Sequence, residues 1–182
     1  MKKTTHPLPD PEECIALPSP CADVRSVNAF ALIGDRAILV DEFGHRVLLF
    51  EPGGEFLRII GANNDISPRW LYPRGLAVDG NEITVCDAYG NRLIHFDFDG
   101  EFREESSACL ASLREPSDIC ALGNGIFAIA ERKGRGIAFV GSSGQLLTRW
   151  NFETKGVSPE SKIEGIRMLP LPSTAPSQPK FP

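Results

Sequence analysis

The stretch that decides the fold is Pro73–Phe102, PRGLAVDGNEITVCDAYGNRLIHFDFDGEF. It alternates turn residues with three short apolar runs, at 75–78, 83–86 and 92–98. The pairs Asp79-Gly80 and Asp99-Gly100 supply the positive φ angles that tight hairpin turns require. The stretch therefore predicts three consecutive antiparallel strands, with a fourth strand beginning directly after the last turn.

The same pattern occurs 46 residues earlier, at 28–56. At this single offset the turn and signature residues correspond: Gly34 to Gly80, Asp41 to Asp87, Gly44 to Gly90, Arg46 to Arg92 and Phe50 to Phe96. A third copy, at 116–146, keeps the glycines of the frame. Its alignment places Ala130 where Asp87 would stand and Gly136 where Arg92 would stand. We therefore expect the third copy to lack the charged pair.

The motif Asp-x-x-Gly-x-Arg, present at Asp41–Arg46 and Asp87–Arg92, resembles the NHL repeat, which is a four-stranded β-propeller blade. A Gly-Glu-Phe turn follows the motif in both copies, and the resemblance covers residues 26–150. It implies an all-β fold built of antiparallel blades with four strands each. It says little about activity, because propellers host many unrelated functions.

The repeats also predict the division of the chain. We expect an extended Pro-rich arm at 1–25, blades at 26–60, 72–103 and 116–152, a partial fourth unit at 161–169, and a disordered Pro-rich tail at 170–182. Between the second and third blades, Glu104–Glu115 breaks the pattern, and Ser107–Leu113 is expected to form one or two helical turns.

Three blades leave an incomplete propeller, because closed rings have about four to eight blades. Three alternatives remain open. A second copy of the chain completes the ring by oligomerisation, the divergent ends supply a blade, or the chain is part or relative of a longer propeller. An open arc would leave apolar blade faces unpaired, which favours association.

The repeated pairs Asp41 with Arg46 and Asp87 with Arg92 allow two interpretations. They could form a charged ring that holds a ligand. Alternatively, each pair is a structural clamp across the turn between the second and third strands of its blade. Arginine suits a clamp because its planar fork holds a carboxylate bidentately. We favour the clamp, since a residue repeated in successive blades serves the blade.

Candidate binding residues are those that are equivalent in the repeat but differ in kind. Just before the innermost strand of each blade stand Asn28, Arg74 and Ser117, with Asp118 beside the last. In β-propellers this edge faces the mouth of the central channel. We therefore predict that Asn28, Arg74 and Asp118 contribute to a polar mouth that contacts a partner or ligand. The alternative is that they cap strand ends and meet water.

Catalytic and metal-binding patterns are missing from the sequence. The three histidines show no paired spacing. Asp97–Glu101 lacks the frame of a calcium loop, and Gly141–Gly144 is a hairpin turn and not a nucleophile elbow. We predict no catalytic residue, no metal ligand and no cofactor.

Composition narrows the partners and the compartment. A net charge of −5 disfavours nucleic acid, although Arg132, Lys133 and Arg135 form a small basic cluster that could join Arg46 and Arg92 in a positive patch. No apolar run reaches the roughly 18 residues of a membrane span, so we expect no membrane partner. Five cysteines without C-x-x-C spacing are typical of reduced thiols, which predicts a cytoplasmic protein.

Together these observations favour a non-catalytic binding scaffold that presents blade turns and the channel mouth to a protein partner. A homodimer that completes the ring is a second expected association. The alternative function is a propeller hydrolase or lyase that acts through polar or metal-binding residues at the channel mouth. RNA binding, known for the NHL domains of tripartite-motif proteins, is a weaker alternative because the chain is acidic.

Overall fold

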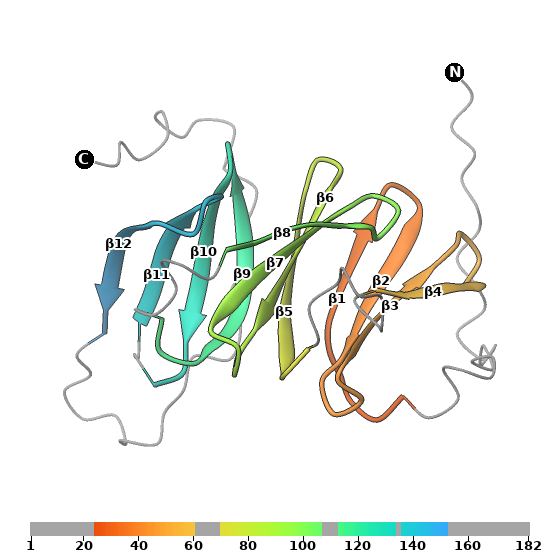
Figure 1. Cartoon of the computed structure of the whole chain (residues 1–182), viewed down its shortest axis with the longest axis horizontal. Helices are drawn as coiled ribbons and strands as arrows, with labels where there is room; N and C mark the ends of the chain where they lie inside the picture. Colours follow the sequence, from red (N-terminus) through yellow and green to blue (C-terminus); the bar gives the residue numbers. More distant parts are fainter. Residues whose placement is uncertain (1–23, 61–69, 107–112, 134–135, 153–182) are drawn as a thin grey trace, which may run out of the picture.

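Figure 1 shows the computed structural model of the chain, which describes residues 24–60, 70–106, 113–133 and 136–152. These residues form three antiparallel sheets of four strands each, so the all-β prediction is confirmed. Blade 1 consists of β1 (Val27–Ile33), β2 (Arg36–Asp41), β3 (Arg46–Phe50) and β4 (Phe56–Ile60). Blade 2 consists of β5 (Pro73–Asp79), β6 (Glu82–Asp87), β7 (Arg92–Asp97) and β8 (Phe102–Ser106). Blade 3 consists of β9 (Pro116–Gly123), β10 (Ile126–Glu131), β11 (Gly136–Gly141) and β12 (Leu146–Asn151).

Within each blade, strands that are consecutive in the chain are hydrogen-bonded neighbours. The turns that join them use the glycine and asparagine residues of the repeat. Asn124 and Gly125, between β9 and β10, have φ angles of 54° and 68°. These angles suit a two-residue hairpin turn, and asparagine and glycine tolerate them better than other residues.

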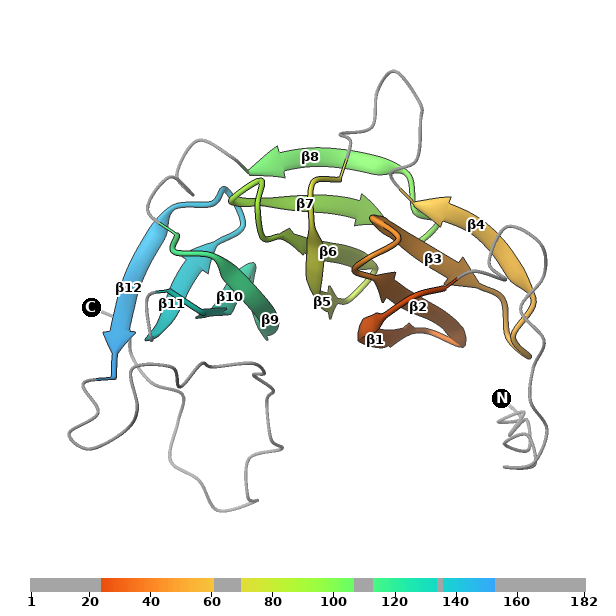
Figure 2. The same ribbon diagram turned by 90° about the horizontal axis from the view of Figure 1, so that it is seen from below.

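The three blades stand side by side along an arc, as Figure 2 shows, with β1, β5 and β9 on the concave side. Each pair of adjacent blades encloses an apolar core. Between blades 1 and 2 this core includes Ile38, Val40, Leu76, Val85 and Phe96. Between blades 2 and 3 it includes Cys86, Leu93, Ile119, Phe127 and Ile129. Because blade 2 is covered on both faces, successive residues of β6 and β7 are buried without alternation.

The structure corrects the end of the second blade. The sequence predicts that its strand pattern ends at Arg103, but β8 continues to Ser106. Glu104 and Glu105 remain in the strand because they pair with His95 and Ile94 of β7 and keep their own side chains exposed. The helical turns predicted from Ser107 fall almost wholly outside the described residues. So do the partial fourth unit, the tail and nearly all of the N-terminal arm.

Candidate functional site

The innermost strands of the three blades line a hollow of about 500 Å³ on the concave side of the arc. β5 approaches β9 closely there, because Gly75 has no side chain. A Cβ atom at this position would lie 2.7 Å from the Cα of Asp118. The hollow is lined at one side by Asn28 and at the other by Asp118.

The structure brings two of the three predicted mouth residues directly together. The side-chain amide of Asn28 donates a hydrogen bond to the backbone oxygen of Arg74, with a length of 3.2 Å. Asp118 Oδ1 accepts from the N–H of Ile119 at 2.9 Å. The guanidinium of Arg74 points elsewhere, with Nε 3.4 Å from Glu42 Oε1 and the group over the ring of Tyr72. Arg74 itself does not line the hollow. Its side chain lies at the rim of the arc, and its backbone oxygen is bonded to Asn28, which does line the hollow.

Asp41 and Asp87 each collect donors from several segments of their blades. Arg46 Nε lies 3.0 Å from Asp41 Oδ2, and Arg92 Nε lies 3.0 Å from Asp87 Oδ2. Both carboxylates also accept backbone N–H groups from the lead-in to the first strand, and Tyr72 N lies 2.6 Å from Asp87 Oδ1. Both aspartates are fully buried. The contacts tie the lead-in, the second strand and the third strand together, as a clamp would.

Blade 3 holds a corresponding carboxylate that the sequence alignment missed. Glu131, not Ala130, stands at the position of Asp87, because Glu131 pairs with Gly136 in the ladder as Asp87 pairs with Arg92. Glu131 accepts the N–H of Arg114 at 3.0 Å and binds the guanidinium of Arg149 at 2.8 Å. The expectation that the third copy lacks the charged pair is therefore wrong. The cation comes from β12 instead of the start of β11.

Aromatic side chains gather on one rim of the arc, where sequence reasoning placed none. Phe43 and Tyr89 occupy the same position in the turns between the second and third strands of blades 1 and 2. Tyr72 lies between them, stacked on Tyr89 with centroids 4.5 Å apart and edge-on to Phe43 at 6.3 Å. We call Phe43, Tyr72 and Tyr89 the aromatic rim cluster. The signal that could have found it is the shared pattern Asp-x-aromatic-Gly.

The rim cluster is exposed and yet held in place. Tyr89 is 63% exposed and Phe43 55% exposed, whereas Tyr72 is half-buried. Burial, with a hydrogen bond to Glu42, raises the pKa of the Tyr72 hydroxyl above its ordinary value. Glu42 itself is buried and lies beside Arg74. The ion pair of Glu42 and Arg74 therefore contacts Tyr72, the central ring of the cluster.

A chain of polar side chains joins blades 2 and 3. His95 Nδ1 lies 2.8 Å from Glu82 Oε1, and His95 Nε2 lies 3.2 Å from Ser106 Oγ. The single hydroxyl proton of Ser106 is donated to the carbonyl of Ser142, at 3.0 Å, so Ser106 accepts from His95. The order of groups is that of a hydrolase triad, but a serine whose proton is held by a backbone carbonyl is a structural link and not an activated nucleophile.

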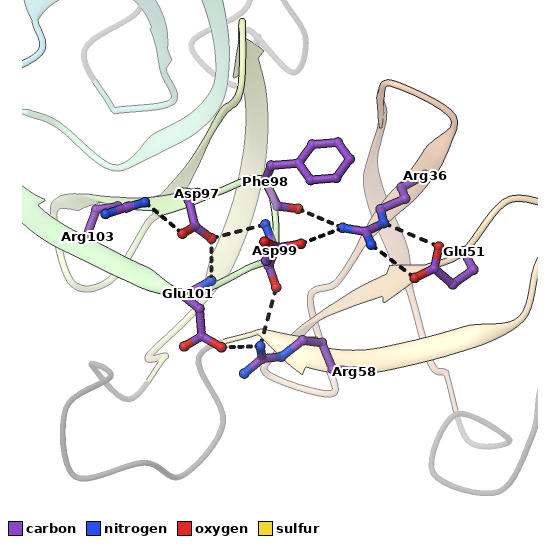
Figure 3. A network of polar contacts seen from close by, with 8 residues as sticks. All are labelled: Arg36, Glu51, Arg58, Asp97, Phe98, Asp99, Glu101 and Arg103. Atoms are coloured by element: carbon purple, nitrogen blue, oxygen red, sulfur yellow. Dashed lines mark hydrogen bonds and ion pairs between the residues drawn. The ribbon is translucent and has the colours of Figure 1, made fainter.

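A larger hollow, of about 560 Å³, is lined by the β5–β6 and β7–β8 turns of blade 2, and most of its lining residues are acidic. A polar network borders it, and Figure 3 shows its members. Arg36 joins Glu51 of blade 1 to Asp99 of blade 2, with NH1 2.8 Å from Asp99 Oδ1. These hydrogen bonds, to Asp99 first and Glu51 second, raise the pKa of Arg36. Asp97 Oδ1 accepts two backbone N–H groups of its own turn, from Asp99 and Glu101, and Asp97 Oδ2 binds Arg103.

Basic residues on the rim lie beside acidic partners. Arg46 and Arg92 bind the aspartates of their clamps. Arg132 NH1 lies 3.5 Å from Glu115, and Lys133 Nζ lies 3.1 Å from the same carboxylate. Arg135 is outside the described residues. The positive patch that RNA binding would use is thereby largely neutralised.

Two further findings concern only the described part of the chain. It contains no group of three or more histidine, cysteine or acidic side chains placed to hold a metal ion. It also contains no helix of the length and apolar character needed to cross a membrane. The hydrolase or lyase alternative stays a prediction.

A family model described as a 6-bladed beta-propeller matches residues 22–128, which is more than half of the chain. The chain belongs to the 6-bladed beta-propeller family. No curated protein matches it. The family is named for six blades, and the described residues of this chain form three.

Solved structures similar to this 6-bladed beta-propeller chain are propellers from unrelated kinds of protein. Virginiamycin B lyase from Staphylococcus aureus is 22% identical with a TM-score of 0.58, and the match covers 89% of this chain and 48% of that one. The Pan2 WD40 domain from Neurospora crassa is 15% identical with a TM-score of 0.53, and the match covers 69% of this chain and 36% of that one. A chain of a nidogen/laminin complex is 18% identical with a TM-score of 0.55, and the match covers 69% of this chain and 49% of that one. The chain spans less than half the length of each, and these identities show the fold alone.

Proposed function

We propose that the chain is a non-catalytic binding scaffold that takes a protein partner on the rim of its propeller. The observation that carries the proposal is the aromatic rim cluster of Phe43, Tyr72 and Tyr89. Tyrosine and arginine are enriched among the residues that dominate protein interfaces. Here two exposed rings flank a third, and Arg74 lies against the third ring.

The cluster also has the rigidity that a binding surface needs. Ring contacts fix Phe43, Tyr72 and Tyr89 against one another, so little side-chain entropy is lost when a partner binds. Arg74 and Asn28 connect the cluster to the hollow on the concave side. The rim and the predicted mouth of Asn28, Arg74 and Asp118 therefore form one continuous candidate surface.

Site-specific photo-cross-linking in the source cells tests this proposal. A photoreactive phenylalanine analogue at position 89 is expected to give a discrete adduct with a protein other than the chain itself. The same analogue at position 57, an exposed leucine of β4, is the control. The proposal fails if position 89 gives no such adduct, or if both positions give the same set of adducts.

The proposal also covers the type of blade, self-association and the cellular compartment. We assign the blades to the NHL type, which is supported by the two Asp-x-x-Gly-x-Arg motifs and their clamp contacts. A second copy of the chain is a further protein partner, at the ends of the arc and not at the rim. We keep the cytoplasm as the compartment, since Cys86 is a buried free thiol. Cell fractionation tests the last point, because recovery outside the cytoplasm would contradict it.

A further inference from the structure

The polar chain that joins blades 2 and 3 has more contacts than ordinary protonation states can satisfy. Glu82 Oε1 lies 2.8 Å from His95 Nδ1, and His95 Nε2 lies 3.2 Å from Ser106 Oγ. Ser106 Oγ lies 3.0 Å from the carbonyl oxygen of Ser142. Each of these three contacts needs a proton between its two atoms, whereas a neutral imidazole and a serine hydroxyl together supply two. With Glu82 ionised, one proton is missing.

Neither neutral form of His95 satisfies all three contacts. If Nε2 carries the ring proton, Nδ1 presents a lone pair to the Glu82 carboxylate at 2.8 Å. If Nδ1 carries it, Ser106 has one proton for two acceptors, which are Nε2 and the carbonyl of Ser142. The described geometry is therefore complete only when His95 and Glu82 hold one additional proton between them.

Burial decides which contact breaks when this proton leaves. His95 is 1% exposed and Ser106 6% exposed, and the ring of Phe127 in blade 3 lies against the imidazole with centroids 6.0 Å apart. A buried polar atom without a partner is costly, because water does not replace the lost bond. The Glu82 side chain is 47% exposed, so solvent can satisfy its carboxylate. The contact to Glu82 is thus the least costly of the three to lose.

We propose that Glu82 and His95 form a proton-dependent latch. With the additional proton bound, the imidazolium donates from Nδ1 to Glu82 and from Nε2 to Ser106. When the pH rises, the Nδ1 proton passes to water, Nε2 keeps its bond to Ser106, and the Glu82 carboxylate turns to solvent. The bond from Ser106 to Ser142 is the same in both states, so the latch moves Glu82 without separating the blades.

Thr84 is placed to complete the deprotonated state. It lies opposite His95 in the ladder between β6 and β7, with Oγ1 3.1 Å from Nδ1. In the protonated state its hydroxyl proton is directed at Glu82 Oε1, 3.5 Å away. Once Nδ1 has lost its proton, the same hydroxyl can rotate and donate to Nδ1. The buried ring therefore has a partner at Nδ1 in either state.

The other groups that face His95 leave Glu82 as its charged contact in the described part of the chain. Glu104 on β8 lies opposite His95 in the ladder, but its side chain is exposed and no hydrogen bond joins it to the ring. From blade 3, the side chain of Phe127 and the carbonyl of Ser142 approach, and neither carries a charge. A change in the charge of the ring therefore acts on Glu82 first.

The latch changes the hollow of about 560 Å³, which lies at the opposite ends of the strands from the aromatic rim cluster. Glu82 lines it together with four other carboxylates, those of Asp79, Asp97, Asp99 and Glu104. Two of these are held by arginines, Asp97 by Arg103 and Asp99 by Arg36, as Figure 3 shows. Glu82 is held instead by a side chain that takes up and releases a proton. The hollow thus gains a free carboxylate when the pH rises, and this property goes beyond the proposed rim surface.

Nitrogen-15 NMR of the histidine rings in the full 182-residue chain tests the latch. The chain has three histidines, and the variants His6→Gln and His45→Asn assign the signals by elimination. From pH 5 to 9, the ring of His95 should change from the doubly protonated form to the neutral form with the proton on Nε2. A ring that is neutral throughout, or a neutral form with the proton on Nδ1, would overturn the inference.

Glu82→Gln separates the latch from a purely structural contact. The glutamine amide can donate to Nδ1, so all three contacts are satisfied without the additional proton. His95 should then take up its proton at a pH lower by about one unit or more, because the opposite charge is gone. Glu104→Gln is the matched control and should shift this pH by less than about 0.5, since an exposed charge is screened. Equal shifts in the two variants would contradict the latch.

Ser106→Ala gives an independent check through the tautomer. Without the hydroxyl, Nε2 has no acceptor, so the neutral ring should carry its proton on Nδ1 and donate to Glu82. If the proton stays on Nε2 in this variant, the chain of contacts does not set the tautomer, and the inference fails. None of these measurements affects cross-linking at position 89, so the rim proposal stands or falls separately.

Discussion

The guanidinium of Arg149 on β12 holds the carboxylate of Glu131 on β10, with Nε 2.8 Å from Oε2 and NH2 3.1 Å from Oε1. In blades 1 and 2 the cation comes from the first residue of the third strand, Arg46 or Arg92. Blade 3 thus keeps the charge pair while it moves the positive partner by one strand. The extra methylene of glutamate accompanies the change of partner.

Loss of this cation should destabilise the fold strongly. In Arg149→Ala, the fully buried carboxylate of Glu131 would lose its charged partner, and breaking a buried pair typically costs about 3–5 kcal/mol. Urea unfolding followed by circular dichroism measures the change. Arg103→Ala removes an arginine from an exposed pair with Asp97 and should cost less than about 1 kcal/mol. Equal costs for the two variants would refute the distinction.

Restoring a side chain at Gly136 should also destabilise blade 3. A Cβ atom at this position would lie 2.3 Å from the backbone oxygen of Trp150. Since a backbone atom cannot rotate away, Gly136→Ala should cost about 1–3 kcal/mol. Thermal or urea unfolding checks this. An unchanged stability would mean that β11 and β12 can move apart at little cost. The close contact at Gly136 would then not explain why blade 3 has no arginine at this position.

The thiol of Cys86 should make stability fall in alkaline solution. Burial, followed by the nearby charge of Asp87, raises the pKa of the Cys86 thiol far above its ordinary value. Above pH of about 8.5 the unfolded chain releases this proton while the folded chain keeps it. The contribution is complete below that pH and falls by up to about 1.4 kcal/mol per pH unit above it.

Cys86→Ala isolates this contribution from other alkaline titrations. Unfolding free energies of both proteins are measured from pH 7 to 10, and the variant should show the shallower decline. Identical slopes would contradict the argument. The folded wild type should also resist alkylation at Cys86 until denaturant is added.

Tyr72 should titrate late, and the chain is well suited to show it, because it has only two tyrosines. In Tyr89→Phe, Tyr72 is the only phenol, and its absorbance change should have a midpoint above the ordinary value of about 10. Glu42→Gln should lower the midpoint, since the bond to the Glu42 carboxylate contributes to the raised pKa. A midpoint at or below the ordinary value would contradict the half-buried position of the ring.

Much of the fold was predictable because the same turn residues recur at one spacing. Gly34 and Gly80 mark equivalent hairpin turns, and Asp41 and Asp87 mark equivalent strand ends. The strand character of Glu104 and Glu105 was not predictable, since charged residues disfavour a strand until the ladder to β7 is known. Local sequence shows propensity, whereas the pairing partner is a property of the assembled sheet.

The sites followed the same division. Asn28 and Asp118 do line the hollow, because position in the repeat determines which residue comes just before the inner strand. The clamp of Glu131 was missed because its partner Arg149 is 18 residues away and on a different strand from Arg46 and Arg92. The rim cluster was missed because Tyr72 belongs to a lead-in and not to the repeated motif. Contacts between non-equivalent residues leave no trace in a repeat alignment.

Each clamp carboxylate draws its donors from its own blade and the few residues before it. Asp41 is bonded within residues 25–46, Asp87 within 71–92 and Glu131 within 114–149. A blade that is copied or lost as one genetic unit therefore takes the cited donors of its clamp carboxylate with it. Duplication or deletion of whole blades leaves no clamp carboxylate without these donors, so blades can be gained or lost as units during evolution.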